Sequence, residues 1–124
     1  MKQVLAIAAG GAMGAVLRWW IAGAVQRLAG GAFPWGTLAV NVLGSFLLGF
    51  LFVWLIERSS VGELARLAIT VGFLGAFTTF STFSVETVRL IQEGALPLAA
   101  GNILSQVVLC VCLAWLGMQL ARLI

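Results

Sequence analysis

The sequence predicts an all-α membrane protein that crosses the bilayer four times. Of its 124 residues, 62% are hydrophobic and only 9% are charged, whereas an ordinary soluble domain carries about 25% charged residues. A helix needs about 20 apolar residues to cross the hydrocarbon of a bilayer, and four such stretches are present, at 4–25, 38–56, 64–90 and 96–120. We therefore expect one four-helix transmembrane domain, residues 1–124, with the lipid bilayer as its surroundings.

The first predicted span, 4–25, carries a small residue at every fourth position. These residues are Ala6, Gly10 and Gly14. The small-xxx-small spacing allows two helix backbones to approach closely in lipid, so we predict a packing face here. A single four-helix chain with so much glycine and so little polar surface indicates a homodimer.

The other three spans each carry a stripe of polar residues at helical spacing. The stripes are Thr37, Asn41 and Ser45 in the second span, Thr79, Thr82 and Glu86 in the third, and Asn102, Gln106 and Cys110 in the fourth. A hydroxyl can bond a carbonyl of its own helix, but an amide at membrane depth is costly unless it is paired or hydrated. Hydrogen bonding between helices explains one stripe, whereas three stripes together favour a pathway.

The third span is predicted to break near the membrane midplane. Gly72, Gly75 and the β-branched pair 78–79 weaken helix continuity close to the middle of 64–90. A break would free backbone carbonyls, which is tolerable only where they line a cavity or bind an ion. A continuous helix with a tight glycine contact is the alternative.

The donors along these stripes favour a small anion as the permeant species. They are the amide of Asn41 and the hydroxyls of Thr37, Thr79, Ser81 and Thr82. No cluster of carboxylates is available to bind a cation. Phe80 and Phe83 share one helix face, and their electropositive ring edges could contact an anion; ordinary packing against lipid or neighbouring helices is the alternative interpretation.

The charged residues and cysteines exclude several function classes. There is no histidine, the four glutamates mostly fall near loops, and Cys110 and Cys112 project from different sides of a helix. Because no nucleophile with a base and no metal-water site is present, we do not expect an enzyme. The net charge of +3 is not gathered into a basic run, so nucleic acid is not an expected partner.

The placement of lysine and arginine gives only a weak orientation signal. One membrane face carries Lys2, Arg58, Arg66 and Arg122, and the other carries Arg27 and Arg89, while Arg18 lies too deep to be assigned. Basic residues favour the cytoplasmic side, but four against two is a small bias. Insertion in both orientations, with two copies meeting antiparallel, and insertion in one fixed orientation both remain open.

Three motifs carry a resemblance to a known family. GGAMGAVLRWW (10–20), GTLAVNVLGSFLLG (36–49) and GFLGAFTTFSTFSVE (72–86), in that order, strongly resemble the Fluc (CrcB) fluoride channel family. The fourth span is similar mainly in length and polar stripe. The resemblance implies an antiparallel, dual-topology homodimer with two pores in a bacterial plasma (inner) membrane, through which fluoride leaves the cytoplasm by passive electrodiffusion.

The resemblance also implies roles for individual residues. Asn41, Phe80 and Phe83 would line the fluoride path, and the backbone carbonyls of Gly75 and Thr78 from both chains would hold a structural Na⁺. The resemblance further makes Arg18 the positive charge of an aqueous vestibule and Glu86 an acidic residue near the end of the path. Thr37, Thr82 and Cys110 would continue the polar track. The family usually carries a hydroxyl at the position of Cys110, and a thiol is a weaker donor.

Two other classes remain as alternatives. A proton-coupled transporter of the small multidrug-resistance type is also a four-helix antiparallel dimer, but it would need a membrane-embedded carboxylate early in the chain. None of the first 56 residues is acidic. A non-transporting assembly subunit of a larger membrane complex would explain the glycine faces but would leave the polar stripes without a role.

Overall fold

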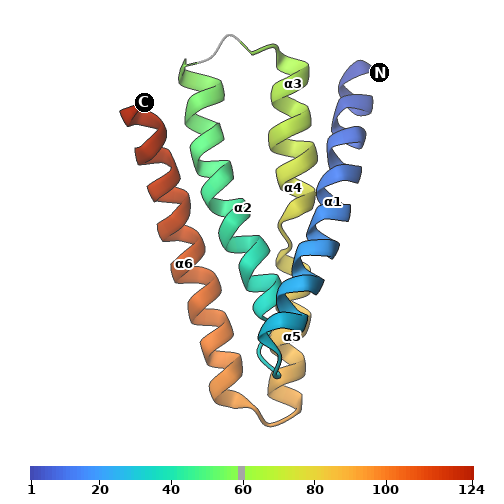
Figure 1. Ribbon diagram of the computed structural model, residues 1–124, viewed down its shortest axis with the longest axis vertical. Helices are drawn as coiled ribbons and strands as arrows, with labels where there is room; N and C mark the ends of the chain where they lie inside the picture. Colours follow the sequence, from blue (N-terminus) through green and yellow to red (C-terminus); the bar gives the residue numbers. More distant parts are fainter. Residues whose placement is uncertain (59–60) are drawn as a thin grey trace.

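A computed structural model describes residues 1–58 and 61–124 (Figure 1). The described residues are helical apart from short connections, and four segments are long and apolar enough to cross a membrane. These segments are Lys2–Ala29, Trp35–Val53, Glu63–Gln92 and Leu96–Leu123. The prediction of an all-helical chain with four apolar spans is confirmed, although the first and last helices extend beyond the predicted bounds.

Glycine and proline mark the two connections at the lower end of the molecule in Figure 1. Helix α1 (Lys2–Ala29) ends at Gly30, whose φ of 67° suits a residue without a Cβ. Helix α2 (Trp35–Val53) begins after Pro34 and continues into a π-helix, η1 (Trp54–Arg58). Gly94, with a φ of 76°, precedes helix α6 (Leu96–Leu123), which has a proline in its first turn.

The third span consists of four pieces. Helix α3 (Glu63–Leu67) leads into a π-helix, η2 (Ala68–Leu74), and a short helix, α4 (Gly75–Phe77). Thr78 (φ −88°, ψ 159°) and Thr79 (φ −152°, ψ 112°) are extended, and helix α5 (Phe80–Gln92) begins after them. Figure 1 shows this extended stretch between α4 and α5.

The glycines of the first span bring α1 against the third span. A Cβ on Gly10 would collide with the carbonyl oxygen of Ala68, and a Cβ on Gly14 would collide with that of Phe73. Both carbonyls belong to η2, the element that α1 contacts most extensively. The predicted packing face is confirmed, and its partner lies within the same chain.

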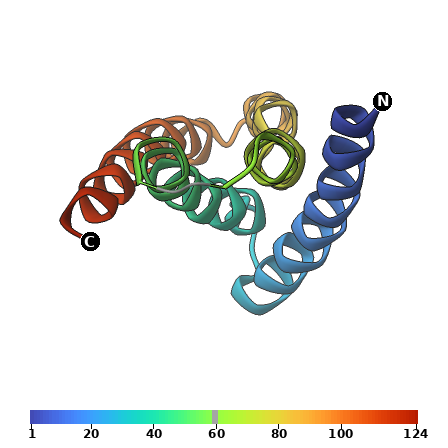
Figure 2. The ribbon, with the colours of Figure 1, turned by 90° about the horizontal axis from the view of Figure 1, so that it is seen from above.

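Helices α2 and α6 form the other close pair, on the far side of the third span from α1 (Figure 2). A Cβ on Gly49 of α2 would meet the carbonyl oxygen of Ala114, and one on Gly117 of α6 would meet that of Phe46. The glycines thus interlock the two helices reciprocally. The first span packs mainly on the third, and the second on the fourth.

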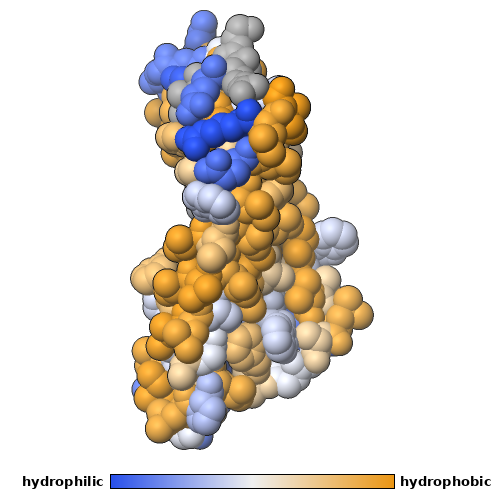
Figure 3. Space-filling model, turned by 90° about the vertical axis from the view of Figure 1, so that its left-hand side faces the viewer, coloured by the Kyte–Doolittle hydropathy of each residue, from blue (hydrophilic) through white to orange (hydrophobic). Residues whose placement is uncertain are grey.

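Apolar side chains cover most of the outer surface in Figure 3, and hydrophilic ones gather at the end that carries the N-terminus. Large exposed apolar residues include Leu5, Trp19, Val107, Val111 and Leu123. An apolar surface of this extent suits contact with lipid or with another chain. The interior is small, and its largest fully buried apolar side chains are Val40, Val53 and Leu74.

Candidate ion pathway

Asn41 of α2 binds the extended backbone between α4 and α5. Its Nδ2 donates to the Thr79 carbonyl oxygen at 3.0 Å, and the Thr79 backbone N–H donates to its Oδ1 at 2.8 Å. The side-chain amide therefore pairs with both backbone groups of Thr79, as a neighbouring strand would. Asn41 is only 8% exposed, so this pairing satisfies polar backbone groups that would otherwise be costly to bury.

Side chains also redirect two backbone N–H groups away from the carbonyls of Gly75 and Thr78. In a continuous α-helix the N–H of Thr79 would donate to Gly75, and the N–H of Thr82 would donate to Thr78. The first N–H instead donates to Asn41, and the second donates to the Thr79 hydroxyl at 3.2 Å. The carbonyls of Gly75 and Thr78, to which the resemblance assigns Na⁺ binding, thus lose their usual α-helical partners.

Released carbonyl oxygens have the chemistry that Na⁺ requires. Hard cations take oxygen ligands, and backbone carbonyls at membrane depth serve this role where a helix is interrupted. In the part of the chain that the structure describes, no group of three or more His, Cys, Asp or Glu side chains could hold a metal ion. The carbonyl oxygens of Gly75 and Thr78 are therefore suitable ligands for the Na⁺ that the resemblance implies.

Gln106 of α6 extends the network that begins at Asn41. Its Oε1 accepts a hydrogen bond from Asn41 Nδ2 at 3.0 Å, and the Cys110 thiol lies 3.9 Å from the same oxygen. The Gln106 side chain is 5% exposed, and its Nε2 has no hydrogen-bond partner among the described residues. Its place in a polar stripe is visible in the sequence, but the direction of its amide depends on contacts with α2.

A cavity of about 320 Å³ lies beside this network. Its walls include Asn41, Ser45, Thr79, Phe80, Phe83, Gln106 and Cys110. The two phenylalanine rings lie 5.3 Å apart between centroids and are tilted by 59°. Phe83 is buried, whereas Phe80 is 78% exposed. The cavity therefore combines two aromatic residues with the amide residues Asn41 and Gln106.

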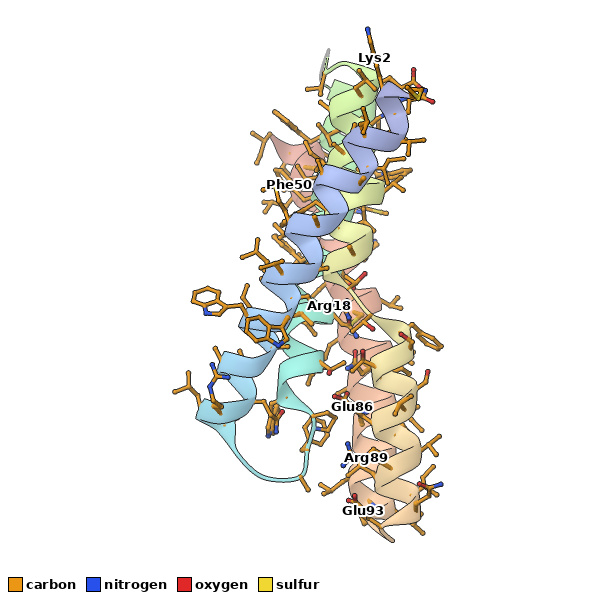
Figure 4. All side chains as sticks on the ribbon, turned by 90° about the vertical axis from the view of Figure 1, so that its right-hand side faces the viewer. Lys2, Arg18, Phe50, Glu86, Arg89 and Glu93 are labelled. Carbon is orange, nitrogen blue, oxygen red and sulfur yellow. The ribbon has the colours of Figure 1, made fainter. Side chains whose placement is uncertain are left out.

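A larger cavity of about 630 Å³ lies nearer the turn between α5 and α6. Its lining includes Arg18, Thr37, Thr79, Thr82, Glu86, Arg89 and Glu93. In Figure 4, Arg18 of α1 lies above Glu86 and Arg89 of α5, and Glu93, just after the end of α5, lies below them. Thr79 lines both cavities, so the two cavities meet at this residue.

Among the described residues, Glu86 is bound by a hydroxyl and by no cation within 4.0 Å. The Thr37 hydroxyl donates to Glu86 Oε1 at 2.8 Å. Arg89 lies one helical turn from Glu86, but the two side chains do not form an ion pair within 4.0 Å. The ion pair found among the described residues joins Arg122 and Glu57 at the other end of the molecule. Glu86 Oε2 and Arg18 Nε are buried without a partner among the described residues.

Three hydroxyls gather where α5 begins. Thr79 Oγ1 lies 2.9 Å from Thr82 Oγ1 and 3.4 Å from Ser81 Oγ. Nine of the ten side chains predicted for the pathway line one or both cavities: Arg18, Thr37, Asn41, Thr79, Phe80, Thr82, Phe83, Glu86 and Cys110. Ser81 lines neither of these two cavities and is exposed.

Comparison with known proteins places the chain in a family. Residues 5–118 match the family described as CrcB-like protein, Camphor Resistance (CrcB). The chain belongs to the CrcB family. The resemblance drawn from the three motifs is confirmed.

Similar proteins of this family cover the chain almost completely. The fluoride-specific ion channel FluC of Magnetococcus marinus is 52% identical over 98% of this chain and 99% of its own length. The protein of the same name from Geobacter sulfurreducens is 49% identical over 98% of each chain. That of Methylococcus capsulatus is 52% identical over 97% of this chain and 53% of its own length. This CrcB-family chain is an integral membrane protein and is not an enzyme.

Proposed function

We propose that this chain is a fluoride-selective channel through which cytoplasmic fluoride leaves by passive electrodiffusion across a bacterial plasma (inner) membrane. The main observation behind the proposal is the pair of cavities that share Thr79 and are lined by hydroxyl-bearing residues, two phenylalanines and the amide residues Asn41 and Gln106. The names of the similar proteins support the same ion. Fluoride is small and tightly hydrated, so selectivity over chloride requires donors that replace its water closely.

The proposed path begins in the larger cavity. The positive charge of Arg18 attracts the anion, and the hydroxyls of Thr82 and Thr79 then replace part of its hydration shell. Thr37 holds the Glu86 carboxylate through a hydrogen bond, so in this path the Thr37 hydroxyl limits the repulsion that Glu86 exerts on the passing anion.

The smaller cavity forms the selective part of the proposed path. Both hydrogens of Asn41 Nδ2 are used within the chain, so Gln106 Nε2 is the amide donor that faces the ion. In this path Asn41 acts indirectly. It orients the Gln106 amide, and it stabilises the extended backbone at Thr79 between α4 and α5. The edges of Phe80 and Phe83 complete the shell, and Cys110 continues the polar wall as a weak donor.

The proposed functional unit is an antiparallel, dual-topology homodimer with two pores and a central structural Na⁺. The exposure of Phe80 beside the cavity supports a second copy that covers this ring. The carbonyls of Gly75 and Thr78, which have lost their usual α-helical partners, are the ligands that each chain would supply. A bound cation would supply the positive charge that keeps these carbonyl dipoles close together.

Fluoride efflux from liposomes tests the proposal. Purified protein is reconstituted alone into vesicles loaded with fluoride or chloride, and the released anion is followed with an ion-selective electrode. We expect rapid release of fluoride without a proton gradient and little release of chloride. The double variant Phe80→Ile with Asn41→Asp should abolish the flux, while Ser84→Ala, whose hydroxyl bonds only its own helix, should retain it.

The same assay separates the alternatives. A strict requirement for a proton gradient would indicate a coupled transporter, and the absence of any flux from correctly folded dimers would indicate an assembly subunit. Unchanged flux in the double variant would refute the assigned pathway. Release that persists after Na⁺ has been removed during purification, with no loss of dimer, would refute the role given to Na⁺.

A further inference from the structure

Two buried amide atoms one helical turn apart on α6 are left without partners. Asn102 is fully buried and Gln106 is 5% exposed. Among the described residues, Asn102 Oδ1 and Gln106 Nε2 have no hydrogen-bond partner. Residues four positions apart lie on the same helix face, with their Cβ atoms about 5–6 Å apart. The first atom needs a donor and the second needs an acceptor.

The orientation of the Asn102 amide follows from α5. The Thr87 hydroxyl donates its single hydrogen to the Phe83 carbonyl at 2.8 Å, so its oxygen can only accept from Asn102. Asn102 must therefore turn Nδ2 toward Thr87, and the two atoms lie 2.9 Å apart. The amide oxygen, Oδ1, is left as the unmatched acceptor.

The orientation of the Gln106 amide follows from the interrupted third span. The backbone N–H and carbonyl of Thr79 fix both ends of the Asn41 amide. Asn41 consequently presents Nδ2 to Gln106, which must turn Oε1 toward it. Gln106 Nε2 is left as the unmatched donor. The orientations of the Asn102 and Gln106 amides are therefore both determined, because each series of hydrogen bonds ends at a backbone group whose donor or acceptor character is fixed.

We propose that Asn102 and Gln106 hold one buried water molecule between them. The water donates to Asn102 Oδ1 and accepts from Gln106 Nε2, so it satisfies both atoms at once. Ordering one water costs less free energy than leaving two buried polar atoms unsatisfied. Fluoride accepts hydrogen bonds but cannot donate one, so an anion here would face the Asn102 oxygen unfavourably. The site therefore selects a small neutral molecule that both donates and accepts.

This site is compatible with the proposed conduction path and does not rest on it. Gln106 Nε2 carries two hydrogens, one for the water and one that can point into the 320 Å³ cavity. The water also closes a ring of hydrogen bonds that starts at Thr79, just before α5, and returns to α5 at Thr87. Phe83 lies between these two residues in the sequence. The water is thus a positioning element for a ring that lines the cavity.

Crystal structures of the full-length protein at a resolution that reveals ordered water test the proposal. Fluoride and water have the same number of electrons, so crystals are grown both without fluoride and with it. We expect one density peak within about 2.7–3.2 Å of both Asn102 Oδ1 and Gln106 Nε2 in each crystal. The proposal is overturned by the lack of a peak in fluoride-free crystals or by a peak that requires fluoride.

Near-isosteric variants test whether both residues hold the water. Gln106→Met and Asn102→Leu each remove one ligand and should each abolish the peak. Ser105→Ala is the matched control, because among the described residues the Ser105 hydroxyl bonds only the Asn102 backbone carbonyl, and it should retain the peak. A peak that survives in Gln106→Met at full occupancy would show that the water does not bridge the two amides. If a variant fails to crystallise, the wild-type pair of structures still decides the question.

Discussion

Replacing Asn41 with leucine should destabilise the fold more than any other single polar-to-apolar change in the second span. The substitution keeps a side chain of similar size but removes three hydrogen bonds, two to the Thr79 backbone and one to Gln106. Polar contacts between membrane helices contribute about 0.6 kcal/mol on average and up to about 1.7 kcal/mol each. Three such bonds give an expected loss of about 2–5 kcal/mol.

Reversible unfolding in mixed micelles of a mild detergent and sodium dodecyl sulfate measures this loss. At about 1.4 kcal/mol for each tenfold change in the folding equilibrium, the shift is well within the range of the method. Ser84→Ala is the control, because its hydroxyl donates to the Phe80 carbonyl within α5, and it should change the free energy of unfolding by less than about 0.5 kcal/mol.

The structure of the leucine variant offers a second test. Without Asn41, the Thr79 N–H can return to the Gly75 carbonyl and lengthen α4, which would recover part of the lost free energy. The same rearrangement would withdraw one of the carbonyls proposed to bind Na⁺. Stability equal to that of the Ser84→Ala control, with Thr79 still extended, would refute the role assigned to Asn41.

Three further predictions concern packing and charge. Gly10→Ala should cost about 1–3 kcal/mol of unfolding free energy, because the added Cβ collides with backbone atoms. Gly11→Ala adds a Cβ that has only ordinary contacts, so it should be neutral or stabilising. Equal effects of the two substitutions in the same micelle assay would contradict this prediction. Thr37→Val should slow fluoride release by removing the hydrogen bond to Glu86, and Thr37→Ser should preserve release; matching rates in both variants would count against it. Glu57→Gln, at an ion pair about half exposed, should shift stability by less than about 0.5 kcal/mol, and a thermal melt showing a large shift would disprove it.

The sequence predicts the spans and most of the polar residues that line the two cavities because both signals are periodic. Apolar stretches of sufficient length define the helices, and polar residues every three or four positions define the inward faces. The glycine face of the first span was predicted correctly for the same reason. Its partner could not be predicted, since a small-residue stripe specifies close approach but not which helix approaches.

The remaining features depend on contacts between distant parts of the chain. Asn41 pairs with Thr79 and Gln106, which lie 38 and 65 positions away in the sequence, so its donors are used within the chain and not offered to an ion. Helical spacing likewise allows Arg89 to pair with Glu86, but the Thr37 hydroxyl of another helix binds Glu86. No local pattern in the sequence indicated the π-helix η2, which packs against α1.

The pairing of the first span with the third, and of the second with the fourth, has a consequence for biosynthesis. When the ribosome has delivered α1 and α2 into the membrane, neither helix yet has its main packing partner. Their glycine faces must then be covered by lipid or by the insertion machinery. The pairs α1 with η2 and α2 with α6 can form only after the later spans arrive, so a truncated chain should keep the contact of α1 with α2 but leave these glycine faces uncovered, and it should be a ready substrate for membrane proteases.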